Sequence, residues 1–103
     1  YQNIDMDFLE FKGLKFNISQ SLIEFKGEKI DLTKNESKIL YSLIKNKEKI
    51  VSRNKLMDEL WQSDEFVDDN TLTVNINRLR KKMESIGAID MLQTKRGQGY
   101  ILQ

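Results

Sequence analysis

The chain has 103 residues, of which 39% are hydrophobic and 32% are charged, and it contains neither cysteine nor histidine. This length and composition predict one globular domain over residues 1–103 with a single modest core. Without those two side chains the chain lacks disulfides, thiol nucleophiles, imidazole bases and the usual zinc sites, so we expect no enzymatic activity, metal or cofactor. No apolar run is long enough to span a membrane and no targeting leader opens the chain, which favours a cytoplasmic protein. Because the first residue is Tyr1 and not Met, we expect a segment of a longer polypeptide.

The charge is distributed unevenly along the chain. Residues 1–69 contain 11 Lys or Arg against 14 Asp or Glu, whereas residues 70–103 contain six against two. A basic end on an otherwise acidic body is typical of a protein that binds a polyanion. A solvated basic helix face would give the same counts, so charge alone leaves both interpretations open.

The N-terminal part of the chain predicts a β-sheet. Its apolar side chains recur at every second position, which is the periodicity of a strand. They are Leu14, Phe16, Ile18, Ile23 and Phe25. Glycines at positions 13 and 27 mark tight turns between these runs. We therefore expect about four short antiparallel strands between residues 8 and 32.

Two short helices are predicted after the sheet. Thr33 and Glu36 have the spacing of a capping box, and apolar residues at helical spacing follow them, so a first helix is expected over residues 33–46. Ser52 is a suitable N-cap for a second helix over residues 52–61.

A third helix and a hairpin complete the predicted fold. The helix is expected over residues 69–85, with Gly87 ending it. Two short apolar runs around a basic, glycine-containing turn predict a β-hairpin over residues 91–102. This order of elements predicts an α+β fold of the winged helix-turn-helix type, in which one helix enters a DNA groove and the hairpin contacts the DNA beside it.

The third helix is predicted to have two different faces. At about 100° per residue its apolar side chains form one stripe that faces the core. They are Leu72, Ile76, Leu79 and Met83. The opposite side has Val74 among polar and basic side chains, which are Asn70, Thr71, Thr73, Asn77, Arg78, Arg80 and Lys81. Methyl, amide and guanidinium groups together suit the major groove, whereas a surface helix with an incidentally exposed valine is the alternative.

Two segments of the chain read FVDDNTLTVNINRLRKKM at residues 66–83 and QTKRGQGY at residues 93–100. These segments resemble the effector domain of OmpR/PhoB-type response regulators, and the likeness extends over nearly the whole chain. The version of the helix at residues 69–77 is most similar to the Gram-positive branch that responds to bacitracin and cationic antimicrobial peptides. The resemblance implies an N-terminal four-stranded antiparallel sheet, three helices and a C-terminal hairpin wing, joined in the full protein to a receiver domain that is absent from this segment.

The resemblance also implies roles for individual residues. Those expected to contact bases are Thr73, Val74 and Arg78. Those expected to contact the DNA backbone are Trp61, Thr71, Asn75, Asn77 and Arg80, to which the helical wheel adds Lys81. In the wing, Arg96 is expected to enter the minor groove with Thr94 beside it. Trp61 could equally be a core aromatic residue. Many relatives have Asp where this chain has Thr73, His at Asn75 and Arg at Asn77, so the helix has fewer charges. Phosphate contacts by Asn75 and Asn77 would be neutral hydrogen bonds, so we expect a weaker salt dependence of binding.

The predicted function is sequence-specific binding of double-stranded DNA by the output domain of a two-component response regulator that controls transcription of antimicrobial-peptide resistance genes. The resemblance implies direct repeats bound by a head-to-tail dimer, a sensor kinase upstream, and contact with RNA polymerase through the loop at residues 62–67. The alternative is a winged-helix module that docks a protein through this acidic loop and has no affinity for DNA. An enzyme using the adjacent carboxylates at 64–65 and 68–69 is the weakest interpretation.

Overall fold

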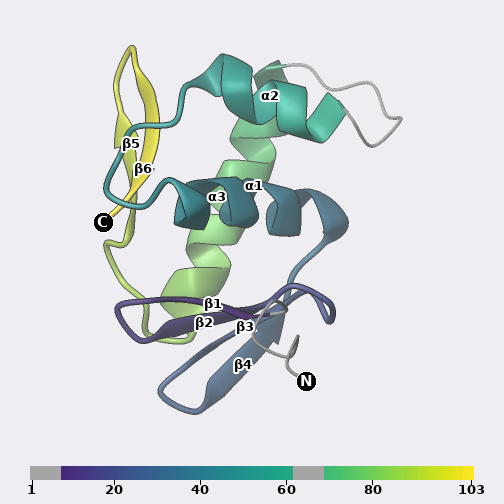
Figure 1. Cartoon of the computed structure of the whole chain (residues 1–103), viewed down its shortest axis with the longest axis vertical. Coiled ribbons are helices and arrows are strands. Elements are labelled where there is room, and N and C mark those ends of the chain that lie inside the picture. The colour runs from purple at the N-terminus through teal and green to yellow at the C-terminus, as the bar shows by residue number, and fades with distance from the viewer. Residues whose placement is uncertain (1–7, 62–68) are drawn as a thin grey trace.

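The computed structural model describes residues 8–61 and 69–103, and it confirms the predicted fold class. A four-stranded antiparallel sheet lies at one end of the molecule, three helices lie above and beside it, and a two-stranded hairpin stands at one side (Figure 1). The elements are β1 (Phe8–Phe11), β2 (Leu14–Asn17), β3 (Leu22–Phe25), β4 (Glu28–Asp31), α1 (Lys34–Lys45), α2 (Arg53–Trp61), α3 (Asp69–Ser85), β5 (Leu92–Lys95) and β6 (Gly99–Leu102).

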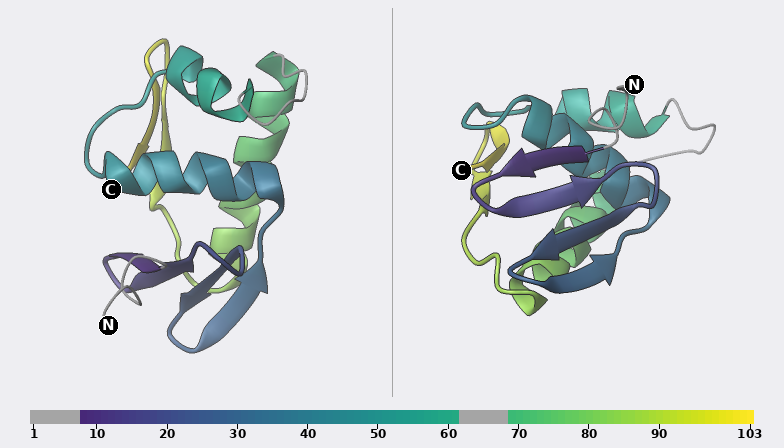
Figure 2. Two further views of the ribbon diagram at one scale, coloured as in Figure 1. Left: turned by 45° about the vertical axis from the view of Figure 1, so that its right-hand side comes forward. Right: turned by 60° about the horizontal axis from the view of Figure 1, so that its bottom comes forward.

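The four-stranded sheet is a simple meander in the order β1-β2-β3-β4. Its first and last connections are two-residue turns in which a lysine and a glycine both have positive φ, as a type I′ hairpin requires. One face of the sheet is buried beneath α1 and the C-terminal end of α3 (Figure 2). Its side chains in the core are Phe11, Leu14, Phe16, Ile23 and Phe25.

The predicted capping box starts α1. The Glu36 amide donates to Thr33 Oγ1 at 3.2 Å, and the Thr33 amide donates to Glu36 Oε1 at 2.8 Å. Glu36 is completely buried, and the same Oε1 accepts a hydrogen bond from Lys82 Nζ at 2.7 Å. Lys82 also donates to the Asp31 carbonyl at 2.9 Å. This ammonium group therefore joins the ends of β4 and α3 to the start of α1.

The caps that the sequence predicts are present at the start of α2 and at the end of α3. Ser52 Oγ accepts a hydrogen bond from the Lys55 amide at 3.1 Å at the start of α2. At the end of α3, Gly87 has φ of +100° and its amide donates to Glu84 O, while the Ala88 amide donates to Met83 O. These two bonds form a Schellman motif, which needs a residue with positive φ. Among residues 8–61 and 69–103, no helix is both long and apolar enough to cross a bilayer.

The β5–β6 hairpin is joined to the link between α1 and α2. Val51 and Tyr100 exchange two backbone hydrogen bonds of 2.8 and 2.9 Å, so residue 51 extends the hairpin by one bridge. Gly99, which precedes Tyr100, has φ of +145°, and a Cβ at this position would lie 2.1 Å from the Val51 carbonyl oxygen. The glycine therefore permits the close approach that fixes the wing to the helices.

Candidate nucleic-acid interface

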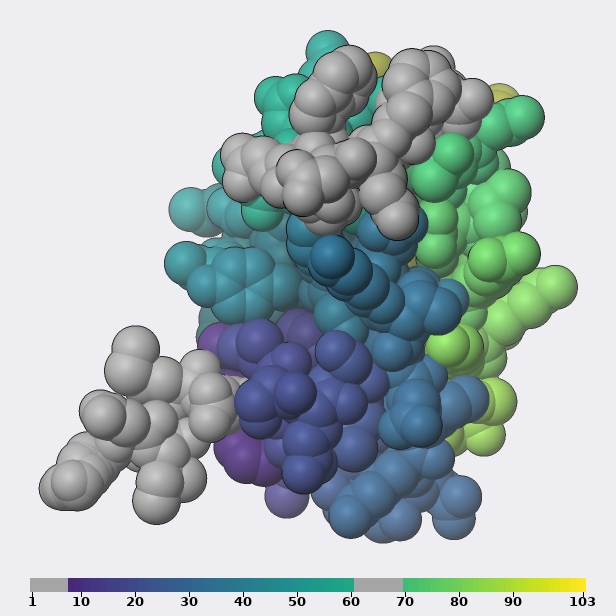
Figure 3. Space-filling view, turned by 90° about the vertical axis from the view of Figure 1, so that its right-hand side faces the viewer, coloured from purple at the N-terminus to yellow at the C-terminus, as the bar shows by residue number. Residues whose placement is uncertain are grey.

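The long helix α3 has the two faces that its periodicity predicts. Its stripe of Leu72, Ile76, Leu79 and Met83 is at most 1% exposed. On the other side Val74 is 42% exposed, and Thr73, Asn77 and Arg78 are exposed beside it. The side chains of α3 project along one edge of the molecule (Figure 3). The expected contact face is therefore open to solvent.

The surface of α3 is positively charged. Arg78 and Lys81 are exposed, and residues 70–83 contain no Asp or Glu. The wing adds Arg96 in the turn between β5 and β6, where it is also exposed. Two elements that are distant in sequence therefore both contribute exposed basic side chains, which suits a polyanion.

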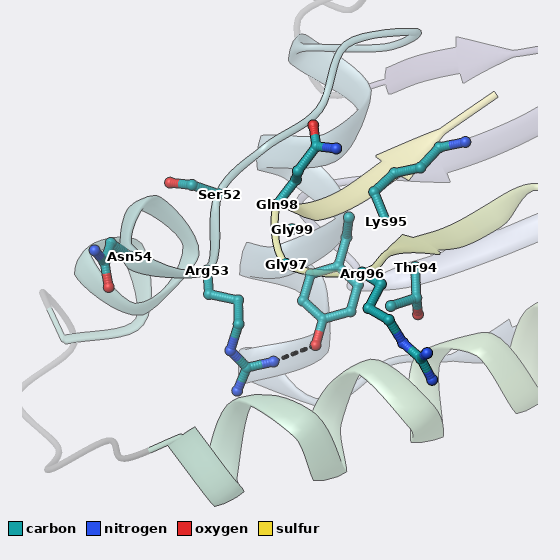
Figure 4. A pocket seen from close by; sticks show the side chains of 10 residues that line it. Ser52, Arg53, Asn54, Thr94, Lys95, Arg96, Gly97, Gln98 and Gly99 are labelled. Atoms are coloured by element: carbon teal, nitrogen blue, oxygen red, sulfur yellow. Dashed lines mark hydrogen bonds between the residues drawn. The ribbon is translucent and has the colours of Figure 1, made fainter.

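A pocket of about 470 Å³ lies between the start of α2 and the wing. Arg53 from α2 and Arg96 from the wing point toward α3 from two sides of this pocket (Figure 4). Arg53 Nη1 donates to the Tyr100 hydroxyl, and the Arg53 guanidinium carbon lies 5.8 Å from the centre of the Tyr100 ring. Arg53 Nη2 donates to Thr73 Oγ1 at 3.1 Å. Arg53 therefore contacts both the wing and the exposed face of α3.

Arg53 is not among the residues that the sequence predicts to form the interface. Its partners Thr73 and Tyr100 are 20 and 47 residues away along the chain. No periodicity or local motif relates positions so far apart, and only the packing of α2 against α3 and the wing brings them together.

Arg80 connects α3 to the wing on a second side. Its Nε donates to the Leu92 carbonyl at 3.2 Å, its Nη1 to Asn77 Oδ1 at 3.1 Å and its Nη2 to Thr94 Oγ1 at 2.7 Å. The residue is half-buried. Thr94, expected to contact DNA, is exposed and lies at the wing end of this network.

Asn75 differs from the other residues of the expected contact set. It is 7% exposed, and its Nδ2 donates to the Thr71 carbonyl at 2.8 Å, one turn earlier in the helix. It lies about 60° from Leu72 on the helical wheel, beside the buried stripe. Its side chain therefore belongs to the packed side of α3. Thr71 is half-buried, while the side chain of Trp61 and the loop at 62–67 lie outside the described residues.

The sequence of this chain matches a known protein family and curated relatives. The family model for "Transcriptional regulatory protein, C terminal" matches residues 27–102. The sensory transduction protein BceR of Bacillus subtilis (strain 168) is 48% identical over 89 residues, which cover 86% of this chain and 38% of BceR. The chain thus spans about two fifths of the length of that curated relative.

Two solved structures share the fold over almost their whole length. The C-terminal domain of the nisin resistance regulator NsrR, a lantibiotic response regulator, has a TM-score of 0.82 and 40% identity, with 92% of this chain and 96% of that chain covered. The DNA-binding domain of the response regulator AdeR, solved in complex with an intercistronic region, has a TM-score of 0.77 and 27% identity, with 91% and 97% covered. The chain belongs to the family of C-terminal domains of transcriptional regulatory proteins, as an OmpR/PhoB-type effector domain of a response regulator.

Proposed function

We propose that this domain binds a specific sequence of double-stranded DNA, with α3 in the major groove and the β5–β6 hairpin at the adjacent minor groove. One observation carries the proposal: Val74 is exposed among Thr73, Asn77 and Arg78, while the opposite stripe of the same helix is fully buried. The major groove admits an α-helix and displays thymine methyl groups beside hydrogen-bonding base edges. An apolar side chain surrounded by amide, hydroxyl and guanidinium groups matches that surface.

The residues of the proposed DNA-binding surface divide by chemistry into those that contact bases and those that contact the DNA backbone. Thr73, Val74 and Arg78 are proposed to contact bases, since a methyl group suits thymine and a guanidinium suits the O6 and N7 atoms of guanine. Phosphate contacts are proposed for Thr71, Asn77 and Lys81, and the wing is proposed to place Arg96 in the minor groove with Thr94 beside it. The buried Asn75 is not part of the proposed surface. A backbone contact by Trp61 stays a prediction.

In the full protein we propose that this domain is the output of a two-component system. A receiver domain phosphorylated by a sensor kinase would control the binding of two copies, head to tail, to direct repeats. The loop at residues 62–67 would contact RNA polymerase, and the protein would act in the cytoplasm. The likeness to the nisin resistance regulator and to BceR supports a role in resistance to antimicrobial peptides.

The experiment starts with selection of the preferred duplex from a random library, followed by fluorescence anisotropy on that duplex and on a scrambled one. Arg78→Ala should weaken binding to the preferred duplex by about 1 to 3 kcal/mol and should change binding to the scrambled duplex much less. Lys29→Ala, on β4, is the charge-matched control and should bind like the wild type. Equal losses on both duplexes for Arg78→Ala would contradict base contact. Absence of any salt-dependent affinity for DNA would favour the protein-docking alternative.

A further inference from the structure

Two arginines each hold a threonine hydroxyl on the proposed DNA-binding surface. Arg53 Nη2 donates to Thr73 Oγ1 at 3.1 Å, and Arg80 Nη2 donates to Thr94 Oγ1 at 2.7 Å. Each pair connects different elements, since Arg53 joins α2 to α3 and Arg80 joins α3 to β5. Both threonines are exposed. One pair therefore holds a hydroxyl on α3, and the other holds a hydroxyl on the wing.

We propose that Arg53 and Arg80 are positioning residues, which fix the wing relative to α3 and orient the hydroxyls of Thr73 and Thr94 toward DNA. This inference rests on the proposed function for its DNA part. It changes the role of Arg80, for which the family resemblance implies a direct phosphate contact.

The contacts of Arg80 are those of an anchor. Its three guanidinium nitrogens donate to three different acceptors, in Asn77, Leu92 and Thr94. One acceptor is the backbone carbonyl of Leu92, so the bond fixes the path of β5 itself. Because the guanidinium is planar and rigid, its bonds to Leu92 and Thr94 define the orientation of the hairpin relative to α3, and its bond to Asn77 holds the guanidinium on the helix. A lysine keeps the charge but has neither the fork nor the planar geometry.

Arg53 has an equally fixed support. Tyr100 is 5% exposed and is held by its two backbone bonds to Val51. The Arg53 guanidinium lies against the Tyr100 ring and donates to the Tyr100 hydroxyl, which leaves Nη2 directed at Thr73. The rotamer of Thr73 is thus set from the wing side of the molecule.

The bonds determine what the two threonines offer to DNA. A hydroxyl oxygen that accepts from a cationic donor becomes a better donor through its own proton, because hydrogen bonds in a chain polarise one another. Thr73 is then directed to acceptors in the major groove, such as guanine O6, purine N7 or thymine O4. Thr94 is directed to a phosphate oxygen or to the N3 and O2 acceptors of the minor groove.

The first test separates positioning from phosphate contact by Arg80. Anisotropy on the selected duplex is measured over a range of salt concentrations for the wild type, Arg80→Lys and Arg80→Met, with Lys29→Met as the control for loss of one charge. We expect both Arg80 variants to lose about tenfold in affinity, equivalent to about 1.4 kcal/mol, with the salt slope of the wild type. A direct phosphate contact gives the opposite result: Arg80→Lys stays close to the wild type, and Arg80→Met lowers the magnitude of the slope by about 0.9.

The second test asks whether each arginine acts through its threonine. In a double-mutant cycle, Arg80→Met with Thr94→Val should lose no more affinity than the larger of the two single variants, and Arg53→Met with Thr73→Val should behave likewise. Additive losses would overturn the proposal. The first cycle is also followed by thermal unfolding without DNA, where additivity would refute the anchoring of the wing. A wild-type domain that prefers no duplex would instead refute the proposed function, and the unfolding cycle would still decide the anchoring.

Discussion

Replacing Gly99 by alanine should detach the wing from the helices. A Cβ at this position would lie 2.1 Å from the Val51 carbonyl oxygen and 2.8 Å from Ser52 Cα. Both are backbone atoms, so no side-chain rotation relieves the overlap. The φ of Gly99, +145°, is in addition a conformation that residues with a Cβ rarely adopt.

The loss of stability in Gly99→Ala can be estimated from the backbone hydrogen bonds that would break and from the backbone strain. If the hairpin moves away, the two backbone bonds between Val51 and Tyr100 break, and each contributes about 0.5 to 1.5 kcal/mol. If it does not move, the strained backbone costs about 1 to 3 kcal/mol in addition to the overlap. The positive φ of residue 99 is strained for alanine even when the hairpin moves, so the strain and the two lost bonds together reduce the free energy of unfolding by about 2 to 6 kcal/mol. For a domain of this size that lowers the Tm by at least about 8 °C.

Gly97→Ala provides the matched control. Gly97 also has positive φ, at +76°, but a Cβ there would meet nothing within 4 Å. Its replacement should cost only the conformational penalty, about 1 kcal/mol. Both variants are compared with the wild type by urea and thermal unfolding, followed by far-ultraviolet circular dichroism. The reasoning is refuted if Gly99→Ala is as stable as Gly97→Ala.

Three further predictions concern single side chains. Lys82→Met should destabilise the domain by about 1 to 3 kcal/mol in urea unfolding, because it leaves the buried carboxylate of Glu36 without its cation. Lys81→Met, which replaces the exposed neighbouring lysine, should change the stability by less than about 0.5 kcal/mol. Equal effects of the two substitutions would contradict a stabilising role for the Lys82–Glu36 ion pair. Thr33→Ala should cost about 1 kcal/mol in the same assay because α1 loses its capping box, and no change would show that the box contributes nothing. Val74→Asp should leave the Tm almost unchanged, because the side chain is 42% exposed, yet remove preferential binding in the anisotropy assay. Retained preference would exclude Val74 from the base contacts.

The sequence predicts those features that depend on neighbouring residues. The capping box of Thr33 and Glu36 and the glycine that ends α3 are local signals, each contained within a few positions. The burial of one stripe of α3 and the exposure of Val74 follow from a single helical period. The class of fold was accessible because these elements occur in an order that few architectures share.

Contacts between distant segments were not accessible in the same way. Nothing within the sequence near Arg53 indicates that its side chain reaches Tyr100, and Lys82 lies 46 residues from the carboxylate that it neutralises. The resemblance implies a phosphate contact for Asn75, whereas the side chain is 7% exposed and its wheel position next to Leu72 puts it beside the packed stripe. Long-range pairs depend on how whole elements pack, and periodicity within one element contains no information about its partner.

A chain of contacts between distant segments connects Gly99 to Thr73, one of the proposed base-contacting residues. Gly99 permits the approach to Val51, the resulting bridge fixes Tyr100, Tyr100 supports Arg53, and Arg53 donates to Thr73 on α3. A substitution at Gly99 should therefore disturb the orientation of Thr73. At a temperature where Gly99→Ala is still fully folded, its affinity for the preferred duplex should fall further than that of Gly97→Ala. If the two variants bind equally, the wing and α3 act independently and the positioning role of Arg53 is excluded.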